Sequence, residues 1–144
     1  MPKIPDSVIA KRDELTPYWR SECGRYVIYV GDNVEVMARL AAESFDAIVT
    51  DPPYSPDDQD LYGELSEFAA KALRPGGVCI AYSGQLGVGR NILALSEHLN
   101  FMWLFALRHT GGEMRFRKFN IFNGWKPIIA CYMEPLDAWW EPLR

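Results

Sequence analysis

Apolar residues in this chain gather into short runs that alternate with stretches of helical periodicity. The runs are rich in β-branched and aromatic residues and are bounded by turn-forming residues, which predicts strands. The predicted strands are Tyr26–Val30, Ala47–Thr50, Val78–Ser83, Phe101–Leu107 and Pro127–Met133. The stretches between them repeat apolar residues every three or four positions, which predicts helices. These are Asn33–Ala42, with Asn33 as the expected N-cap, Asp60–Leu73 and Leu86–Leu99.

This order of strands and helices predicts an α/β fold. Continuous apolar strands between helices are typical of a mostly parallel sheet covered on both faces. No helical pattern separates Phe101–Leu107 from Pro127–Met133, so we expect a C-terminal antiparallel hairpin at one edge of the sheet. Residues 1–25 mix Pro, charge and aromatics without periodicity. We therefore expect an irregular N-terminal arm over 1–25 and a folded domain over 26–144.

The composition places the chain among soluble globular proteins. It has 144 residues, of which 49% are hydrophobic and 24% charged, values that argue against disorder. Its apolar stretches are too short for a membrane span, and its N-terminus lacks the apolar core of a signal peptide. We therefore expect a cytoplasmic protein with no membrane partner. The cysteines Cys23, Cys79 and Cys131 are widely spaced, and only His98 and His109 accompany them, so we assign no metal.

The charge is spread unevenly. The net charge of −4 counts against a nucleic-acid partner, because phosphate contacts need cations. Between Arg108 and Lys126, however, five Lys/Arg residues accompany one acid, and aromatic residues lie among them. Cations with aromatics suit a surface that binds a nucleic-acid backbone and stacks bases. The candidates are Arg115, Arg117, Lys118 and Lys126. The alternative is a loop whose aromatics pack on the core and whose cations are merely solvated.

The segment Asp51-Pro52-Pro53-Tyr54 follows a buried strand directly. Ligands of open α/β sheets bind just past the carboxyl ends of strands. An exocyclic base amine is a poor nucleophile, because its lone pair is delocalised into the ring. The Asp51 carboxylate and the Pro52 carbonyl could accept its N–H bonds and localise that lone pair. The prolines would hold these acceptors rigidly. Tyr54 would stack on a base extruded from the duplex. The alternative is a turn stiffened by two prolines.

The run from Gly31-Asp32 through Ser44-Phe45-Asp46 to Asp51-Pro52-Pro53-Tyr54 resembles the S-adenosylmethionine-dependent amino-DNA methyltransferases, most of all their permuted (β-class) group. The resemblance implies Asp51, Pro52, Pro53 and Tyr54 as catalytic residues, DNA as the partner and S-adenosylmethionine as the cofactor. It also implies that Gly31, Asp32 and Asp51 contact the cofactor. A helix N-cap is the alternative role for Asp32.

The glycine loop that binds the cofactor in that family is not evident. Gly84-Gln85-Leu86-Gly87-Val88-Gly89 is the only candidate, and a glycine-rich turn bordering the active site is its better interpretation. On the family's sheet order, 3-2-1-4-5-7-6, the first two strands would be absent. Tyr26–Val30 would lose its neighbour, and Ala47–Thr50 would become an open apolar edge. The chain would then be a fragment, or a second chain or second copy would complete the sheet, or Tyr26–Val30 would pair with Ala47–Thr50 directly.

An Asp at the first motif position is, in that family, more typical of adenine N6 than of cytosine N4 methylation. The sequence therefore predicts a DNA methyltransferase acting on an exocyclic amine, foremost adenine N6, as in restriction–modification. Methylation of cytosine N4 or of an RNA base is one alternative. A catalytically inactive DNA- or partner-binding remnant, or a half-enzyme, is the other.

Overall fold

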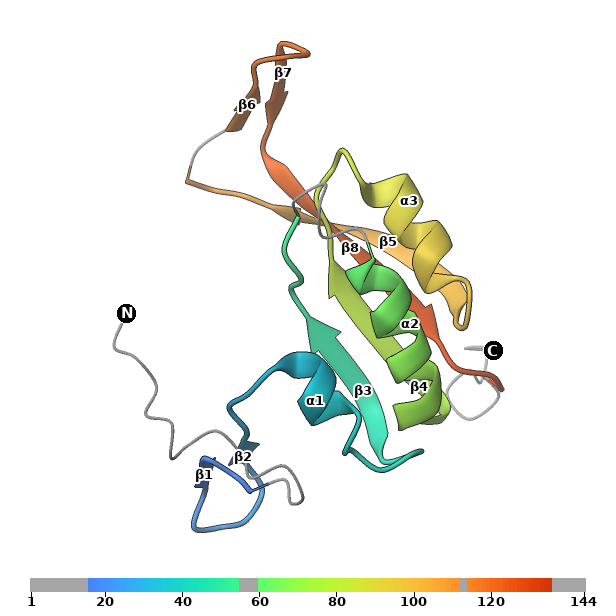
Figure 1. The fold of residues 1–144 in the computed structure, drawn as a ribbon. Coiled ribbons are helices and arrows are strands. Elements are labelled where there is room, and N and C mark those ends of the chain that lie inside the picture. Colours follow the sequence, from blue (N-terminus) through green and yellow to red (C-terminus); the bar gives the residue numbers. More distant parts are fainter. Residues whose placement is uncertain (1–15, 55–59, 112–113, 136–144) are drawn as a thin grey trace, which may run out of the picture. The chain divides into compact units, whose positions relative to one another are not determined.

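The computed structural model describes residues 16–54, 60–111 and 114–135 (Figure 1). The chain divides into two compact units, residues 1–41 and 42–144. The first fifteen residues of the expected arm and the last nine of the expected domain lie outside the described part. The boundary between the units follows Ala41, whereas the sequence suggests one after residue 25.

Unit 1 holds two very short strands and one short helix. β1 (Trp19–Arg20) pairs with β2 (Val27–Ile28) in an antiparallel ladder, and α1 (Asn33–Met37) follows. β1 therefore lies inside the segment that the sequence predicts to be irregular. The strand expected over Tyr26–Val30 is reduced to two residues, and its ladder partner is β1.

The N-terminus of α1 corrects the expected cap. Asp32, not Asn33, is the N-cap residue, with an extended backbone at φ −64° and ψ 132°. Its Oδ1 accepts hydrogen bonds from the backbone N–H of Val34 at 2.9 Å and of Glu35 at 3.3 Å. An aspartate one position earlier reaches both of these otherwise unpaired amides, as a good N-cap does.

Unit 2 carries the main sheet and two covering helices. Its elements are β3 (Phe45–Thr50), α2 (Leu61–Ala72), β4 (Leu73–Tyr82), α3 (Val88–Leu95), β5 (Asn100–Arg108), β6 (Met114–Phe116), β7 (Ile121–Asn123) and β8 (Trp125–Tyr132). All the expected strands of this unit are present with shifted ends, and α3 is shorter than the helix expected over Leu86–Leu99. The expected loop between the last two strands contains the β6–β7 hairpin.

The main sheet has the strand order β3-β4-β8-β5. β3 pairs with β4 in parallel, and β8 is antiparallel to both of its neighbours, β4 and β5. Thus β3, β4 and β5 point in one direction and β8 points in the other. The protein is α/β, as the sequence predicts. The sheet is mixed and not mostly parallel, because two of its three ladders are antiparallel.

The register of the sheet defines two rows of side chains on opposite faces, because directly paired residues share a face. The covered row faces α2 and α3, which lie on the same side of the sheet (Figure 1). It consists of Ile48, Cys79, Cys131 and Phe101. The open row lies on the other face and consists of Val49, Ile80, Ala130 and Trp103. The core of unit 2 therefore sits between the covered row and the two helices.

Buried hydrogen bonds fix the helices to one another and to the sheet. The Ser66 hydroxyl on α2 donates to the Leu95 carbonyl at 2.7 Å and accepts from the His98 N–H at 3.2 Å. The Tyr62 hydroxyl donates to the Tyr82 carbonyl at 2.8 Å. Burial raises the pKa of Tyr62, so its phenol remains a donor. These bonds anchor α2 at the end of β4, beside the end of β3 from which the Asp51–Tyr54 motif begins.

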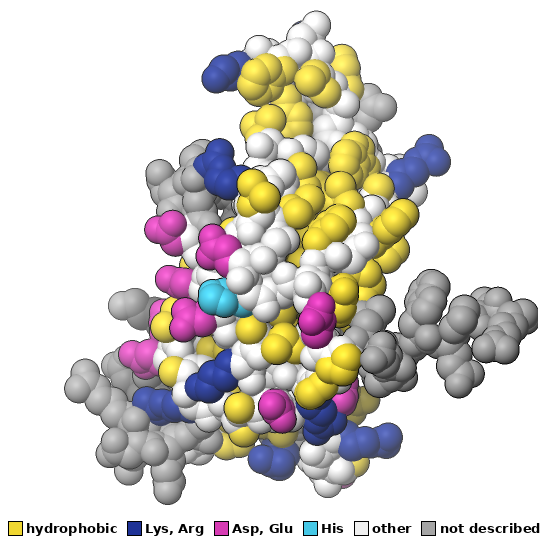
Figure 2. Space-filling model, turned by 90° about the vertical axis from the view of Figure 1, so that its right-hand side faces the viewer, with side chains coloured by type: hydrophobic (Ala, Val, Ile, Leu, Met, Phe, Trp, Pro, Cys, Tyr) yellow, Lys and Arg dark blue, Asp and Glu magenta, His cyan; other side chains and the backbone are white. Residues whose placement is uncertain are grey.

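Exposed apolar side chains mark the outer strands. On β5, Trp103 is 62% exposed, and Phe101, Leu104, Phe105 and Leu107 are exposed as well. Figure 2, which views the molecule from the right-hand side of Figure 1, shows hydrophobic side chains gathered into a band. β3 forms the opposite edge of the sheet, with Val49 exposed. Within the described residues, no helix is long and apolar enough to cross a membrane.

Candidate active site

The motif Asp51–Tyr54 lies at the carboxyl end of β3. The β3–β4 ladder ends with the pair Thr50 and Ala81, so Asp51 leaves the sheet at the level of Tyr82. Pro52 and Pro53 have no N–H to continue the ladder, and residues 51–54 form neither helix nor strand. β8 runs antiparallel to β4, which brings the beginning of β8 to this same end of the sheet.

Lys126 of β8 meets Asp51 at this end. Its Nζ lies 3.0 Å from Oδ1 and 3.0 Å from Oδ2 of the carboxylate, so both oxygens accept a hydrogen bond from the ammonium. The Tyr54 hydroxyl donates a further hydrogen bond to Asp51 Oδ1. The Asp51 side chain is 55% exposed and the Lys126 side chain 21%. The pair therefore lies at the surface of unit 2, with the lysine more enclosed than the aspartate.

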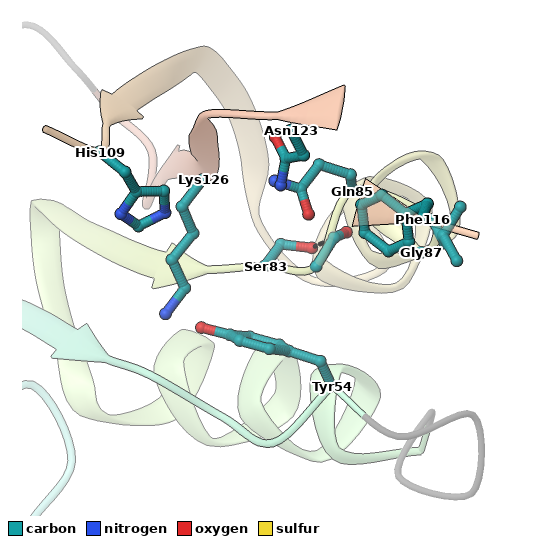
Figure 3. Close-up of a pocket in the computed structure, with 10 residues that line it drawn as sticks. Tyr54, Ser83, Gln85, Gly87, His109, Phe116, Asn123 and Lys126 are labelled. Carbon is teal, nitrogen blue, oxygen red and sulfur yellow. Dashed lines mark hydrogen bonds between the residues drawn. The ribbon is translucent and has the colours of Figure 1, made fainter. Parts of the chain in front are cut away.

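Two aromatic rings enclose the same ammonium. Lys126 Nζ lies 4.6 Å from the centroid of the Tyr54 ring and 4.8 Å from that of the Tyr82 ring, within the range of cation–π attraction. Figure 3 shows the side chains of Lys126 and Tyr54 pointing toward each other from opposite sides of a cavity. The sequence groups Lys126 with the predicted DNA-binding cations, whereas the structure pairs it with Asp51.

A cavity of about 370 Å³ opens beside this cluster. Its volume falls within the range of small-ligand pockets, roughly 300–1,000 Å³. The lining residues are Tyr54, Ser83, Gly84, Gln85, Leu86, Gly87, His109, Phe116, Asn123 and Lys126 (Figure 3). They come from the motif loop, the turn after β4, the end of β5, the β6–β7 hairpin and β8, so segments distant in the sequence build one cavity.

The glycine-rich turn after β4 forms one wall of the cavity. A Cβ added at Gly84 would lie 3.2 Å from Tyr54 Cβ, closer than nearly all real contacts of this kind. Glycine at this position therefore lets the turn approach the motif loop. Ser83 Oγ accepts a hydrogen bond from Asn91 Nδ2 at 2.9 Å, which ties the turn to α3. This placement agrees with a glycine turn bordering the site.

Some residues of the cavity escape sequence reasoning. Asn123 Oδ1 accepts from the Trp125 N–H at 3.1 Å, and Gln85 Nε2 donates to the Trp125 carbonyl. Asn123 carries no motif, and its place depends on the β6–β7 hairpin folding back toward the turn after β4, to which Gln85 belongs. Ser83 could have been suspected, because it ends a predicted strand.

Gly31 and Asp32, the predicted cofactor contacts, belong to unit 1. Both residues are exposed, and Asp32 caps α1. The alternative role considered for Asp32, a helix N-cap, is therefore present in the structure. Asp51 belongs to unit 2. Two of the three predicted cofactor contacts thus lie in one unit and the third in the other.

The remaining predicted DNA contacts lie on the β6–β7 hairpin. Arg115 Nε and Nη2 donate to Asn120 Oδ1 at 3.1 and 2.5 Å, and its guanidinium lies 5.6 Å from the Phe122 ring centroid. Lys118 Nζ lies 5.5 Å from the centroid of the Phe119 ring. Arg117 is exposed. Phe119 and Phe122 are 50% and 61% exposed, so these rings are available on the surface of the hairpin.

No group of three His, Cys, Asp or Glu side chains suited to a metal occurs among the described residues. Within the same residues the cysteines are free. Burial raises the pKa of Cys79 to about 12 and that of Cys131 to about 11, which makes both thiols inert.

Comparison with known proteins finds likeness in structure alone. No protein-family model and no curated protein matches the chain. Among solved structures, 66 chains match. TTHA0409 of Thermus thermophilus, a predicted DNA modification methylase solved with S-adenosyl-L-methionine, has a TM-score of 0.61 at 17% identity. The match covers 80% of this chain and 55% of that one.

Two further structures show the same likeness. The PvuII DNA methyltransferase, which is cytosine-N4-specific, has a TM-score of 0.59 at 15% identity over 72% of this chain and 48% of that one. M1.HpyAVI in complex with S-adenosylmethionine has a TM-score of 0.51 at 15% identity over 67% and 45%. The chain has the fold of these methyltransferase structures. It spans about half their length.

Proposed function

We propose that this chain is the catalytic part of an S-adenosylmethionine-dependent DNA methyltransferase that methylates an exocyclic base amine, foremost adenine N6. One observation carries the proposal: a carboxylate and an aromatic ring of the motif converge on a single N–H donor beside a cavity. Lys126 Nζ is that donor, with Asp51 and Tyr54 as its partners. A base amine needs the same two partners, an acceptor for its N–H and a flat face for its ring.

Asp51 and Pro52 would prepare the amine for reaction. The carboxylate accepts one N–H and the Pro52 carbonyl accepts the other, so the nitrogen lone pair is drawn out of the ring and becomes nucleophilic. Such preorganised acceptors act most strongly where charge develops in the transition state. When the nitrogen gains a methyl group it also gains positive charge, and the Asp51 carboxylate lies where it can take up the surplus proton. Tyr54 holds the plane of the base.

S-adenosylmethionine supplies the electrophilic methyl group when bound. The exposed Asp32 carboxylate suits the hydroxyl groups of a ribose, and the exposed Gly31 lies beside it in the chain. Asp32 Oδ1 already accepts the two amides of α1, which fixes the orientation of the carboxylate. We assign Gly31, Asp32 and Asp51 to the cofactor.

The β6–β7 hairpin would bind the DNA backbone. Arg115, Arg117 and Lys118 present exposed cations there, and Phe119 and Phe122 present rings on which bases can stack. The hairpin also supplies Phe116 and Asn123 to the cavity lining. A strand bound along it would therefore pass beside the pocket that is to receive the flipped base.

The test is transfer of a labelled methyl group from S-adenosylmethionine to DNA by the wild-type chain and by Asp51→Ala. We expect Asp51→Ala to lose about 10²-fold or more in rate, the usual effect of removing a preorganised catalytic contact. Asp46→Ala is the matched control: it removes a carboxylate of the same strand, which pairs with Arg74 at 2.7 Å at the surface. It should keep the rate within about twofold. Full activity of Asp51→Ala would refute the proposal.

Nucleoside analysis of the labelled DNA identifies the target. N6-methyladenine supports the adenine assignment, and N4-methylcytosine or a labelled RNA base replaces it with one of the alternatives.

A half-enzyme or an inactive remnant is the second candidate, and the open edge of the sheet favours it: β3, which carries the motif, is an edge strand with Val49 exposed. A second chain or second copy could complete the sheet there. Titration of S-adenosylmethionine into the folded chain separates the candidates. Saturable binding supports a catalyst that acts alone, whereas absent binding with DNA binding retained supports the half-enzyme or remnant.

A further inference from the structure

We propose that Lys126 is a placeholder for the target amine: its ammonium fills the place of the base amine between Asp51 and Tyr54 and withdraws when a base enters. The inference rests on the proposed function and assigns a positioning residue to it. It also separates Lys126 from the DNA-backbone cations with which the sequence groups it.

The contacts of the ammonium are those that a base amine would need. Nζ lies 3.0 Å from each carboxylate oxygen of Asp51, so the ammonium occupies the space in front of both oxygens. The same atom lies 4.6 Å from the centroid of the Tyr54 ring and so occupies the space beside that ring. A base can therefore reach neither Asp51 nor the stacking face of Tyr54 while Lys126 stays in place.

The Lys126 ammonium can move away from Asp51 without a change in the backbone. Its backbone is fixed in β8, since residue 126 pairs with Leu107 in the ladder with β5. Its long side chain ends at a carboxylate that is 55% exposed, and ion pairs open to water are weak because solvent screens them. Moving the ammonium aside needs only rotations about the bonds of a flexible stem. The sheet and the motif loop can remain unchanged.

The pair also explains how Asp51 coexists with a polyanionic substrate. An unpaired carboxylate at the mouth of the cavity would repel approaching phosphates. Lys126 neutralises that charge until a base arrives whose N–H groups can take over Asp51. A base able to donate hydrogen bonds from an amine competes for the carboxylate, whereas a sugar without a base does not. Displacement therefore favours a base that carries an amine.

The test compares two single-stranded oligonucleotides by fluorescence anisotropy. One carries a single adenine among thymines, and the other an abasic site at the same position. The quantity of interest is the Kd for the abasic strand divided by the Kd for the adenine strand. We expect Lys126→Met to raise this ratio about three- to tenfold, because the base no longer has to displace the ammonium. Lys126→Gln, which keeps a polar side chain, should raise it in the same direction.

Lys118→Met is the matched control, because it removes the same charge from the hairpin, where Lys118 faces a ring. It should weaken binding of both strands equally and leave the ratio unchanged. In an Asp51→Asn background, where the ion pair is already broken, the rise caused by Lys126→Met should disappear. Circular dichroism confirms that each variant is folded.

Other results would overturn the inference. If Lys126→Met weakens both strands equally, Lys126 is an ordinary backbone contact. If the ratio falls, Lys126 binds the base itself. If the wild-type chain prefers adenine and Lys126→Met leaves that preference unchanged, the inference alone fails. If neither protein distinguishes adenine from the abasic site, no base site exists, and the proposed function fails with it.

Discussion

β8 and β5 lie side by side in the sheet and are built from the same kinds of residue, yet one is buried and the other is not. Ile129 and Cys131 on β8 are fully buried, whereas their directly paired residues on β5, Leu104 and Phe101, are 37% and 44% exposed. The cause is position: β8 is flanked by β4 and β5, and β5 has a single neighbour at the edge. Apolar composition thus predicts a strand but does not predict its coverage.

β8 and β5 also differ in how far neighbouring strands support them. Lys126 extends from β8, whose backbone is hydrogen-bonded on both sides, so its anchor is fixed while its tip can move. β5 presents apolar side chains without such cover, as an edge strand that invites pairing or association. Lys126 thus extends from a central strand, and the exposed apolar surface lies on an edge strand.

The largest expected effect comes from truncating directly paired residues of these two strands. Ile129 of β8 and Leu104 of β5 oppose each other and share a face. Ile129→Ala should destabilise the fold by about 2–5 kcal/mol, because it leaves a cavity in a packed core. Leu104→Ala, at a side chain that is 37% exposed, should cost clearly less. Urea denaturation of each variant measures the difference. Equal losses would mean that β5 is as well covered in solution as β8.

Buried and exposed cysteines should also differ in their reactivity. Burial raises the pKa of Cys131 on β8 to about 11 and that of its partner Cys79 on β4 to about 12, the latter also through the neighbouring Cys131. Neither should react with iodoacetamide at pH 8 in the folded chain. Cys23 is exposed, and hydrogen bonds from Ser21 and then Arg25 lower its pKa to about 7, so it should react at once. A Phe105→Cys thiol on β5 should react as well.

Mass spectrometry of the alkylated chain identifies the modified sites, and urea should expose all of them.

The two buried thiols also make the stability of the fold depend on pH. Their folded pKa lies above the unfolded value of 9.0, so the stability they contribute is complete below about pH 9 and falls as the pH rises toward 11–12. Rapid alkylation of Cys131 in the folded chain would show that β8 is not covered.

The sequence predicts the strands, the α/β class and the position of the catalytic motif, because apolar runs and the Asp51–Tyr54 segment are local signals. It does not predict that Lys126 meets Asp51. That contact joins residues 75 positions apart, and it depends on β8 lying next to β4 in antiparallel register. Asn120 carries a local signal for the turn between β6 and β7, because its φ of +53° suits Asn. Asp32 and Asn33 are both N-cap candidates by sequence, and the structure has Asp32 as the N-cap.

The smallest expected change in stability concerns Trp103, at the centre of the exposed edge. Trp103→Lys removes a side chain that is 62% exposed, so the free energy of unfolding should stay within about 0.5 kcal/mol of the wild-type value. The charge should nevertheless reduce self-association, because a charged edge strand resists pairing with another chain. Light scattering at rising protein concentration measures the association. Ile129→Lys is the control: it places the same charge in the core and should unfold the chain. If Trp103→Lys loses nearly as much stability as Ile129→Ala, another surface covers β5 in solution. The difference in exposure between β5 and β8 would then exist only in the isolated chain.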